Sequence, residues 1–116
     1  MSDVIILHNP RCSKSRATLA LLESRGISPH IVDYLAQPPS AGELADILER
    51  LALEPRALMR RDEDDYARLG LDDDALTRAQ LIAAMVDHPQ LIQRPIVLAN
   101  GKTALGRPPE NVLTIL

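Results

Sequence analysis

The chain has 116 residues and a formal net charge of −3, which is enough length for one domain with a real core. Hydrophobic residues make up 46% and charged residues 25%, as in soluble globular domains, and no basic run suggests binding to nucleic acid or membrane surfaces. With no Trp, no Phe and only two Tyr, the chain also lacks the stacking platform that single-stranded nucleic acids require.

The N-terminal residues through Leu7 are apolar over only a few positions and have no basic segment before them, so they do not resemble a signal peptide. No stretch approaches the ~20 apolar residues of a membrane helix, and we therefore expect a cytoplasmic protein. The single cysteine, Cys12, excludes an internal disulfide and is either a buried spectator or a reactive thiol. Taken alone, the spectator reading is favoured, because free cysteine often behaves as a small buried hydrophobe.

The N-terminal third of the sequence predicts a β-α-β unit with parallel strands. A strand is expected over 4–7, a helix over 13–25 and a second strand over 29–34. The turn signal His8-Asn9-Pro10 separates the first strand from the helix, and Gly26 is a plausible helix stop. The helical pattern places Ala17, Ala20, Leu21 and Ser24 on one face.

The middle of the sequence is expected to be helical. Ser40 reads as an N-cap, and Glu43 three residues later completes a capping box. One or two short helices are expected within 55–66, and Thr77 is expected to cap a helix that ends near His88. Apolar residues follow Ser40 at helical spacing, at Leu44, Ile47, Leu48 and Leu51.

The C-terminal part predicts a β-hairpin, because the apolar runs 96–99 and 102–105 flank Asn100-Gly101, a strong type I′ turn signal. Pro108-Pro109 is then expected to open a last helix. A β-α-β unit followed by a β-β-α unit is the thioredoxin arrangement. We therefore predict one α/β domain over 1–116, with a thioredoxin-like fold, a central four-stranded mixed sheet flanked by helices, and a helical insertion between the two units.

The residues around Cys12 favour a reactive thiol over a buried, unreactive cysteine. Cys12 follows a strand and a turn and opens a helix, where free N–H groups and the helix dipole favour a thiolate and also bind oxyanions. Arg11, Lys14 and Arg16 are expected to add positive field, and His8 is expected near the sulfur. Basic residues cost roughly 0.3–1 kcal/mol each at a helix N-terminus, so their presence points to function.

Two known motifs are absent around the thiol. Position 18 is Thr18, where a phosphatase-type loop needs Arg, and position 15 is Ser15, where a thioredoxin-type pair needs Cys. Since the sequence has no second thiol, an external thiol must reduce an oxidised Cys12. Ser13 and Ser15 are read as helix caps whose hydroxyls could also reach the sulfur or an anion.

No metal site is expected from the remaining charged residues. The acidic runs 62–65 and 72–74 lack the residue spacing of a metal-binding loop, and we interpret them as acidic faces exposed to solvent. His30 and His88 have no metal-ligand spacing to each other or to Cys12, and His88 suits the C-terminal end of a helix.

The segment His8-Asn9-Pro10-Arg11-Cys12-Ser13-Lys14-Ser15-Arg16 resembles the His-Asn-Pro-x-Cys-x-x-Ser-Arg signature of the ArsC family. Further resemblance covers essentially the whole chain. Residues 34–39 are similar to the family's Tyr-Leu-x-x-Pro-Pro, and 56–60 to its Arg-x-Leu-x-Arg segment. Residues 91–97 match Leu-Ile-x-Arg-Pro-Ile-Val, and 106–108 include its final Arg-Pro.

This resemblance implies a thioredoxin-like oxidoreductase: a glutaredoxin-dependent arsenate reductase of arsenic detoxification. It implies an enzyme that binds no cofactor, uses glutathione as co-substrate, and has arsenate, glutathione and glutaredoxin as partners; we expect a monomer. It also implies that the Arg94-Pro95 peptide is cis. The implied site consists of the nucleophile Cys12, the oxyanion-binding Arg60, Arg94 and Arg107, and the supporting residues His8, Ser15 and Pro95.

The sequence departs from the family's arsenate reductases at two points and leaves two alternatives open. It has Ser13-Lys14 where they carry Gly after the cysteine, and it ends at Leu116 where longer relatives continue, which places it in a shorter subgroup. One alternative is a general monothiol thiol–disulfide oxidoreductase, which would not need three converging arginines. The other is a Spx-like regulator that binds RNA polymerase, although the Cys-x-x-Cys switch of such regulators is absent; a polymerase pulldown would test it.

Overall fold

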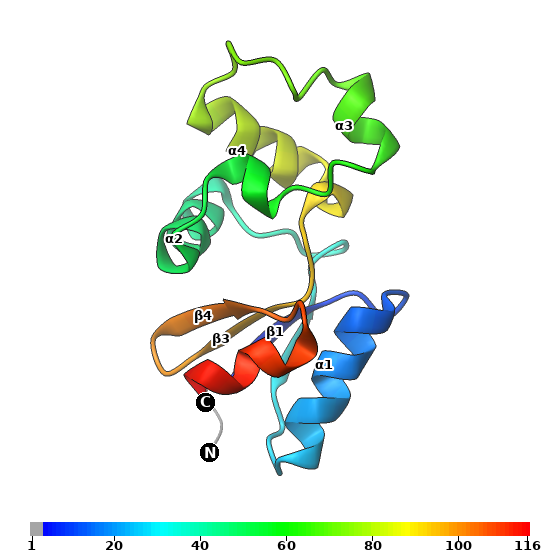
Figure 1. Ribbon diagram of the computed structural model, residues 1–116, viewed down its shortest axis with the longest axis vertical. Helices are drawn as coiled ribbons and strands as arrows, with labels where there is room; N and C mark the ends of the chain where they lie inside the picture. The colour runs from blue at the N-terminus through cyan, green and yellow to red at the C-terminus, as the bar shows by residue number, and fades with distance from the viewer. Residues whose placement is uncertain (1–3) are drawn as a thin grey trace. The chain divides into compact units, whose positions relative to one another are not determined.

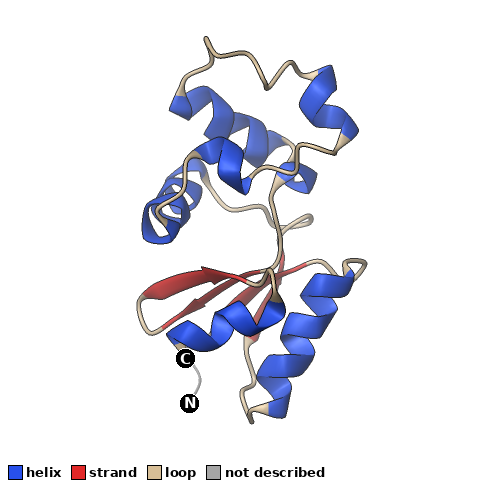
Figure 2. Cartoon of the chain, in the orientation of Figure 1, coloured by secondary structure: helices blue, strands red, loops and turns tan. Residues whose placement is uncertain are grey.

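A computed structural model describes residues 4–116, which form two compact units (Figures 1 and 2). The first unit consists of residues 4–37 together with 94–116, and the second of residues 38–93. The second unit is therefore inserted in the sequence of the first. That the whole chain acts as a single domain stays a prediction.

The first unit is built on a four-stranded mixed sheet with the strand order β2-β1-β3-β4. Strand β1 (Ile5–His8) pairs in parallel with β2 (His30–Asp33) and antiparallel with β3 (Ile96–Ala99), which pairs antiparallel with β4 (Lys102–Leu105). The predicted mixed sheet, its four strands and its β-α-β and β-β-α halves are confirmed. The only differences are at the ends of β1 and β2, which lie one residue from their predicted bounds.

One face of this sheet is covered by helix α1 (Ser13–Ser24) and by the 3₁₀ helix η3 (Pro109–Ile115), which contact each other (Figure 1). The register places Ile6, Val97 and Ala104 side by side across three strands on that face. The predicted last helix is thus present, but it forms as a 3₁₀ helix. The buried core of the unit is Val4, Ile6, Leu22, Val97, Ala99, Ala104, Val112 and Ile115.

The face of α1 that the sequence pattern singled out is not the buried face. The buried residues are Ser15, Thr18 and Leu22, whereas Leu21 is half-buried and the other predicted residues, Ala17, Ala20 and Ser24, are exposed. Apolar residues lie on more than one side of α1, so their spacing alone does not fix its orientation. Small buried side chains allow the first turns of α1 to approach neighbouring backbone closely.

Two turns of the first unit follow the prediction in detail. Gly26 has a φ of 75° directly after the C-cap of α1, and its lack of a Cβ suits this left-handed conformation. Asn100 and Gly101 have φ values of 55° and 72°, as a type I′ hairpin turn requires. The Asn100 side-chain amide also donates to the Ile115 carbonyl at 2.8 Å, which links the hairpin to η3.

The second unit is helical. It contains α2 (Ala41–Leu51), η1 (Pro55–Leu58), α3 (Asp64–Arg68), α4 (Arg78–Asp87) and η2 (Pro89–Leu91), and α2 packs against α4. This agrees with the predicted helical insertion. Within residues 4–116, no helix is both long and apolar enough to cross a membrane.

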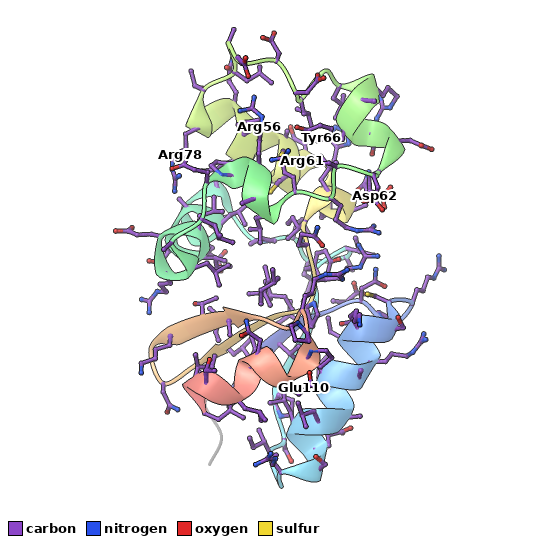
Figure 3. The ribbon with its side chains drawn as sticks, in the orientation of Figure 1. Arg56, Arg61, Asp62, Tyr66, Arg78 and Glu110 are labelled. Atoms are coloured by element: carbon purple, nitrogen blue, oxygen red, sulfur yellow. The ribbon has the colours of Figure 1, made fainter. Side chains whose placement is uncertain are left out.

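Capping and loop contacts fix these helices. Ser40 with Glu43, and Thr77 with Gln80, each form a complete capping box, and His88 is the C-cap of α4. The three cap predictions are therefore confirmed. In the loop that follows α3, backbone carbonyls accept from Arg56, labelled in Figure 3: Leu71 at 3.1 Å and Asp73 at 2.6 Å.

We predict that Ser40→Ala lowers the free energy of unfolding by about 1 kcal/mol, because the Glu43 amide loses its hydrogen-bond acceptor. Chemical denaturation monitored by far-UV circular dichroism measures the change. Ser28→Ala, which alters an exposed serine outside any helix or strand, is the control and should have no measurable effect. Equal stabilities of the two variants would contradict a role for the cap.

Candidate active site

The loop between β1 and α1 places the only thiol of the chain at the start of the helix. Cys12 is the N-cap residue of α1, with extended backbone angles of −94° and 123°. Its amide donates to the Asn9 carbonyl, and the Arg11 amide donates to the Asn9 side-chain oxygen, both at 3.0 Å. The loop is thus a hydrogen-bonded turn that leaves the Cys12 side chain partly exposed.

The hydroxyl of Ser15 lies at the centre of this turn. Ser15 is fully buried, and its Oγ accepts from the Asn9 amide at 3.0 Å and lies 2.7 Å from His8 Nδ1. The prediction that Ser13 and Ser15 cap the helix is wrong, because the N-cap position belongs to Cys12. The buried hydroxyl instead ties the end of β1 to the first turn of α1.

His8, which the sequence placed near the sulfur, contacts Ser15. Burial of the imidazole is the main effect on its pKa and lowers it; the Asp33 carboxylate opposes this, and the Arg16 guanidinium reinforces it. The net pKa of His8 lies below its ordinary value, so the ring is neutral at neutral pH. A neutral imidazole beside a hydroxyl can accept or donate through Nδ1 according to its tautomer.

The Cys12 thiol is acidified by its position. Burial alone would raise its pKa, but the backbone amides of Ser15 and Lys14, followed by the Arg94 guanidinium, favour the thiolate and bring the pKa below the ordinary value. The side chain forms no capping hydrogen bond of ordinary geometry, so the amides act on a nearby, polarisable sulfur. The expected contribution of basic side chains therefore comes from Arg94, in a distant segment of the chain.

The segments around Arg94 and Arg107 lie together. The Arg94-Pro95 peptide is cis, as predicted, and the Arg107-Pro108 peptide is also cis, which the sequence analysis did not predict. Arg107 Nη1 donates to the Arg94 carbonyl at 3.3 Å, and the Gly106 amide donates to the Pro95 carbonyl at 2.9 Å. Within residues 4–116, the buried Arg94 Nε has no hydrogen-bond partner.

Sequence reasoning missed Gly106 as a residue of this site. A Cβ built on Gly106 would lie 2.7 Å from the Pro95 ring and 2.7 Å from the Thr18 hydroxyl, closer than such contacts allow. Thr18 itself donates to the Lys14 carbonyl in the first turn of α1 at 2.8 Å. Gly106 therefore lets α1, the Pro95 segment and the Arg107 segment meet; the only signal in the sequence was a glycine directly before a candidate arginine.

Arg60 belongs to the second unit. Its backbone amide donates to the Leu91 carbonyl at 2.7 Å, beside the antiparallel bridge between Met59 and Ile92. Its guanidinium pairs with Glu63 at 2.5 Å and with Asp62 at 3.8 Å. The predicted role of Arg60 as an anion ligand stays a prediction.

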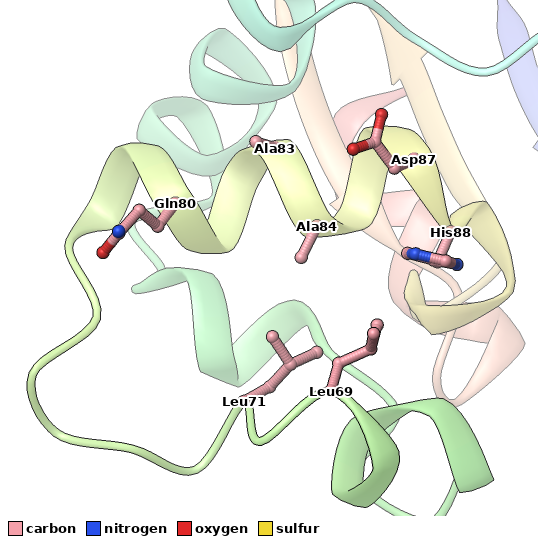
Figure 4. A pocket seen from close by; sticks show the side chains of 7 residues that line it. All are labelled: Leu69, Leu71, Gln80, Ala83, Ala84, Asp87 and His88. Atoms are coloured by element: carbon pink, nitrogen blue, oxygen red, sulfur yellow. The ribbon is translucent and has the colours of Figure 1, made fainter.

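The second unit also carries a hollow between α4 and the segment around Leu69 and Leu71, shown in Figure 4. None of the predicted site residues lines it. Within residues 4–116, no cluster of three or more His, Cys, Asp or Glu side chains is arranged to hold a metal ion. The residues lining the hollow are Leu69, Leu71, Gln80, Ala83, Ala84, Asp87 and His88.

Comparison with known proteins identifies the family. A family model described as "ArsC family" matches residues 7–115. The chain belongs to the ArsC family. This membership agrees with the resemblance found in the sequence and with the thioredoxin-like arrangement of the sheet.

The chain is similar to several known proteins over all or nearly all of their length. A protein of Neisseria meningitidis named arsenate reductase is 53% identical over 117 residues, covering 100% of both chains. The protein YfgD of Escherichia coli K12 is 54% identical, covering 98% of this chain and 97% of its own. The solved structure of an arsenate reductase from Vibrio cholerae has a TM-score of 0.95 and 54% identity, covering 97% of each chain.

We predict that Cys12 in this ArsC-family chain titrates below the free-thiol value of ~8.5, because two helix amides and Arg94 favour its thiolate. The rate of iodoacetamide labelling across pH measures the inflection. Arg94→Ala should move the inflection to higher pH, whereas Arg25→Ala, at the other end of α1, should leave it in place. An inflection at or above the free-thiol value in the unaltered chain would contradict the activated thiolate.

We predict that Gly106→Ala destabilises the fold by about 1–3 kcal/mol, because the new methyl group overpacks the contact with Pro95 and Thr18. The labelling inflection of Cys12 should shift with it, since α1 and the Arg94 segment are displaced. Gly42→Ala is the matched control, because Gly42 lies in α2 with no atom near its would-be Cβ, and it should be neutral or stabilising. Denaturation curves that show Gly42→Ala to be less stable than Gly106→Ala would contradict the close approach at Gly106.

Proposed function

We propose that this chain is an arsenate reductase that uses the Cys12 thiolate as its nucleophile and draws its electrons from glutathione and glutaredoxin. The observation that carries the proposal is the acidified thiol at the N-cap of α1, whose pKa is lowered by two helix amides and by the Arg94 guanidinium. The names of the full-length relatives support the choice of arsenate. The reaction requires no bound cofactor.

Arginine side chains are proposed to hold the substrate beside the thiolate. Arsenate is a strongly hydrated oxyanion, so its binding needs convergent cationic donors. Arginine stays charged and can donate two parallel hydrogen bonds to one oxyanion. Arg94 offers a buried Nε that is unpartnered within residues 4–116, and Arg107 lies against the Arg94 backbone. The helix amides that favour the thiolate add a further positive field.

Arg60 is proposed as the third donor. Because its guanidinium pairs with Glu63 and Asp62, arsenate would have to compete with those carboxylates. The pairs are partly exposed, and such ion pairs contribute only about 0–1 kcal/mol, so exchange for an oxyanion is feasible. Arg60 would then bind arsenate at a modest free-energy cost.

The proposed reaction has three steps. The Cys12 thiolate attacks arsenate, forming a sulfur–arsenic bond and releasing hydroxide, which is protonated to water. Glutathione then attacks the Cys12 sulfur, forming a Cys12–glutathione disulfide as the sulfur–arsenic bond breaks; its electron pair stays on arsenic, which leaves as arsenite. A glutaredoxin thiolate removes the glutathionyl group and returns Cys12 to the thiolate.

His8, Ser15 and Pro95 are proposed as supporting residues. The His8 ring lies 2.7 Å from the Ser15 hydroxyl, and together they hold the loop that carries Cys12 against the first turn of α1. Pro95 fixes the backbone next to Arg94 and packs against Gly106. Their role is to keep the thiolate and the arginines in the correct relative positions, because small displacements in a site reduce the reaction rate strongly.

We predict that Arg94→Ala cuts arsenate reduction by at least ~100-fold, the scale of losing one donor to transition-state charge. Arg94→Lys should recover only part of the loss, because lysine lacks the bidentate fork. Arsenite release from arsenate, with glutathione plus glutaredoxin compared with thioredoxin, measures the activity and identifies the reductant. Cys12→Ser should abolish turnover in a chain that still folds.

The control for this prediction is a second substrate on the same variants. Reduction of an uncharged mixed disulfide should be affected far less, since no oxyanion develops there. Arg60→Ala and Arg107→Ala should show the same contrast. Equal losses for both substrates, or no loss for either, would remove the case for arsenate and favour a general monothiol oxidoreductase.

A further inference from the structure

Three exposed cations lie close to Cys12 in the sequence. Arg11 directly precedes Cys12, and Lys14 and Arg16 lie in the first turn of α1, which contains no acidic residue. We call Arg11, Lys14 and Arg16 the basic rim. Arg16 Nη1 donates to the Pro10 carbonyl at 3.1 Å and so helps to hold the loop.

The other two members of the basic rim have no internal partner. Within residues 4–116, neither the Arg11 nor the Lys14 side chain forms a hydrogen bond or an ion pair. Their charges also stand at the positive end of the α1 dipole, where cations are unfavourable. Two unpaired charges at an unfavourable position indicate a role other than stabilising the fold.

Arg11 and Lys14 are also not the main causes of the lowered Cys12 pKa. The groups that favour its thiolate are the backbone amides of Ser15 and Lys14 and the guanidinium of Arg94. The charged ends of Arg11 and Lys14 are not among these main causes, and their expected contribution to the positive field stays a prediction. Both side chains therefore remain available to an approaching molecule.

The distribution of charge along the sequence strengthens this reading. Residues 1–37 and 94–116 hold seven Lys and Arg against four Asp and Glu, whereas residues 38–93 hold six against twelve. The net acidic chain thus contains a net basic thiol-bearing unit. Five of its seven cations lie in the segments that form the site: Arg11, Lys14, Arg16, Arg94 and Arg107.

We propose that Arg11 and Lys14 select the charge of the small thiol or disulfide that exchanges with Cys12, favouring anionic partners over neutral and cationic ones. The proposal rests on the proposed function in that an anionic peptide thiol such as glutathione is the reductant there. The selection acts through approach and encounter, where a local positive field raises the rate for anions and lowers it for cations.

The selected step can be isolated without arsenate. The Cys12 thiolate attacks a symmetrical disulfide, a new bond forms between Cys12 and one sulfur, and the other sulfur leaves as a thiolate with the electron pair of the broken bond. No proton is consumed. This exchange is the reverse of the attack by a small thiol on a Cys12 mixed disulfide, so both directions share one transition state and one charge preference.

The experiment measures second-order rates of Cys12 oxidation by three disulfides in excess: glutathione disulfide, a dianion; cystamine, a dication; and the uncharged 2-hydroxyethyl disulfide. Intact-mass spectrometry follows adduct formation. In the double variant Arg11→Gln/Lys14→Gln, the rate with glutathione disulfide should fall about fivefold and that with cystamine should rise about fivefold at low salt. The rate with the uncharged disulfide should change by less than a factor of two.

The matched control is Arg25→Gln/Lys102→Gln, which removes the same charge from exposed positions of the same unit. Arg25 follows the last residue of α1, some ~20 Å along the helix from Cys12, which is beyond the screening length of ~10 Å at 0.1 M salt. In this control variant, the ratio of the glutathione disulfide rate to the cystamine rate should equal the ratio in the unaltered chain. High salt should collapse the ratio in the unaltered chain.

Equal changes for all three disulfides, or the same shift in the control variant, would overturn the proposal. The outcome is independent of arsenate reduction. Charge-selective exchange in a chain that does not release arsenite would refute the proposed function and leave this inference standing. Arsenite release without charge-selective exchange would refute this inference and leave the proposed function standing.

Discussion

The geometry of the site depends on one buried hydroxyl. Ser15 Oγ accepts from the Asn9 amide and contacts His8 Nδ1, so the end of β1 and the first turn of α1 are held by a single atom. A buried polar group of this kind is costly unless it is satisfied, which makes any other path of the loop unfavourable. Cys12 reaches the N-cap position, and the helix amides reach its sulfur, because the loop is held in this path.

A second constraint brings the distant segments to that thiol. Gly106 packs against the Pro95 ring and Thr18 without space for a side chain. The Arg107 side chain and the Gly106 amide donate to the Arg94 and Pro95 carbonyls, which joins the two segments. Because α1 presents the small side chains of Ser15 and Thr18 inward, the helix comes near enough for Arg94 to act on Cys12. The effect of the Arg94 charge on the Cys12 thiol thus depends on close packing between these segments.

Much of this could be predicted from the sequence, because it depends on local rules. The capping box at Ser40, the cap at Thr77 and the Asn100-Gly101 turn each leave a short local signature, whereas the cis bond before Pro95 was implied by the resemblance to the ArsC family. The inward face of α1 and the role of Ser15 could not be predicted, since both depend on partners far away in the sequence. The 3₁₀ form of the last helix and the contact at Gly106 depend in the same way on tertiary packing.

The discontinuity of the first unit has a consequence for biosynthesis. Strand β1 must pair with β3, which lies about ninety residues later in the sequence, whereas the inserted unit is one continuous segment, residues 38–93. On the ribosome, which adds about 5–20 residues per second, the inserted unit is complete while β1 still lacks its antiparallel neighbour. Arg94 emerges late, so its charge reaches the Cys12 thiol only after the inserted unit has been made.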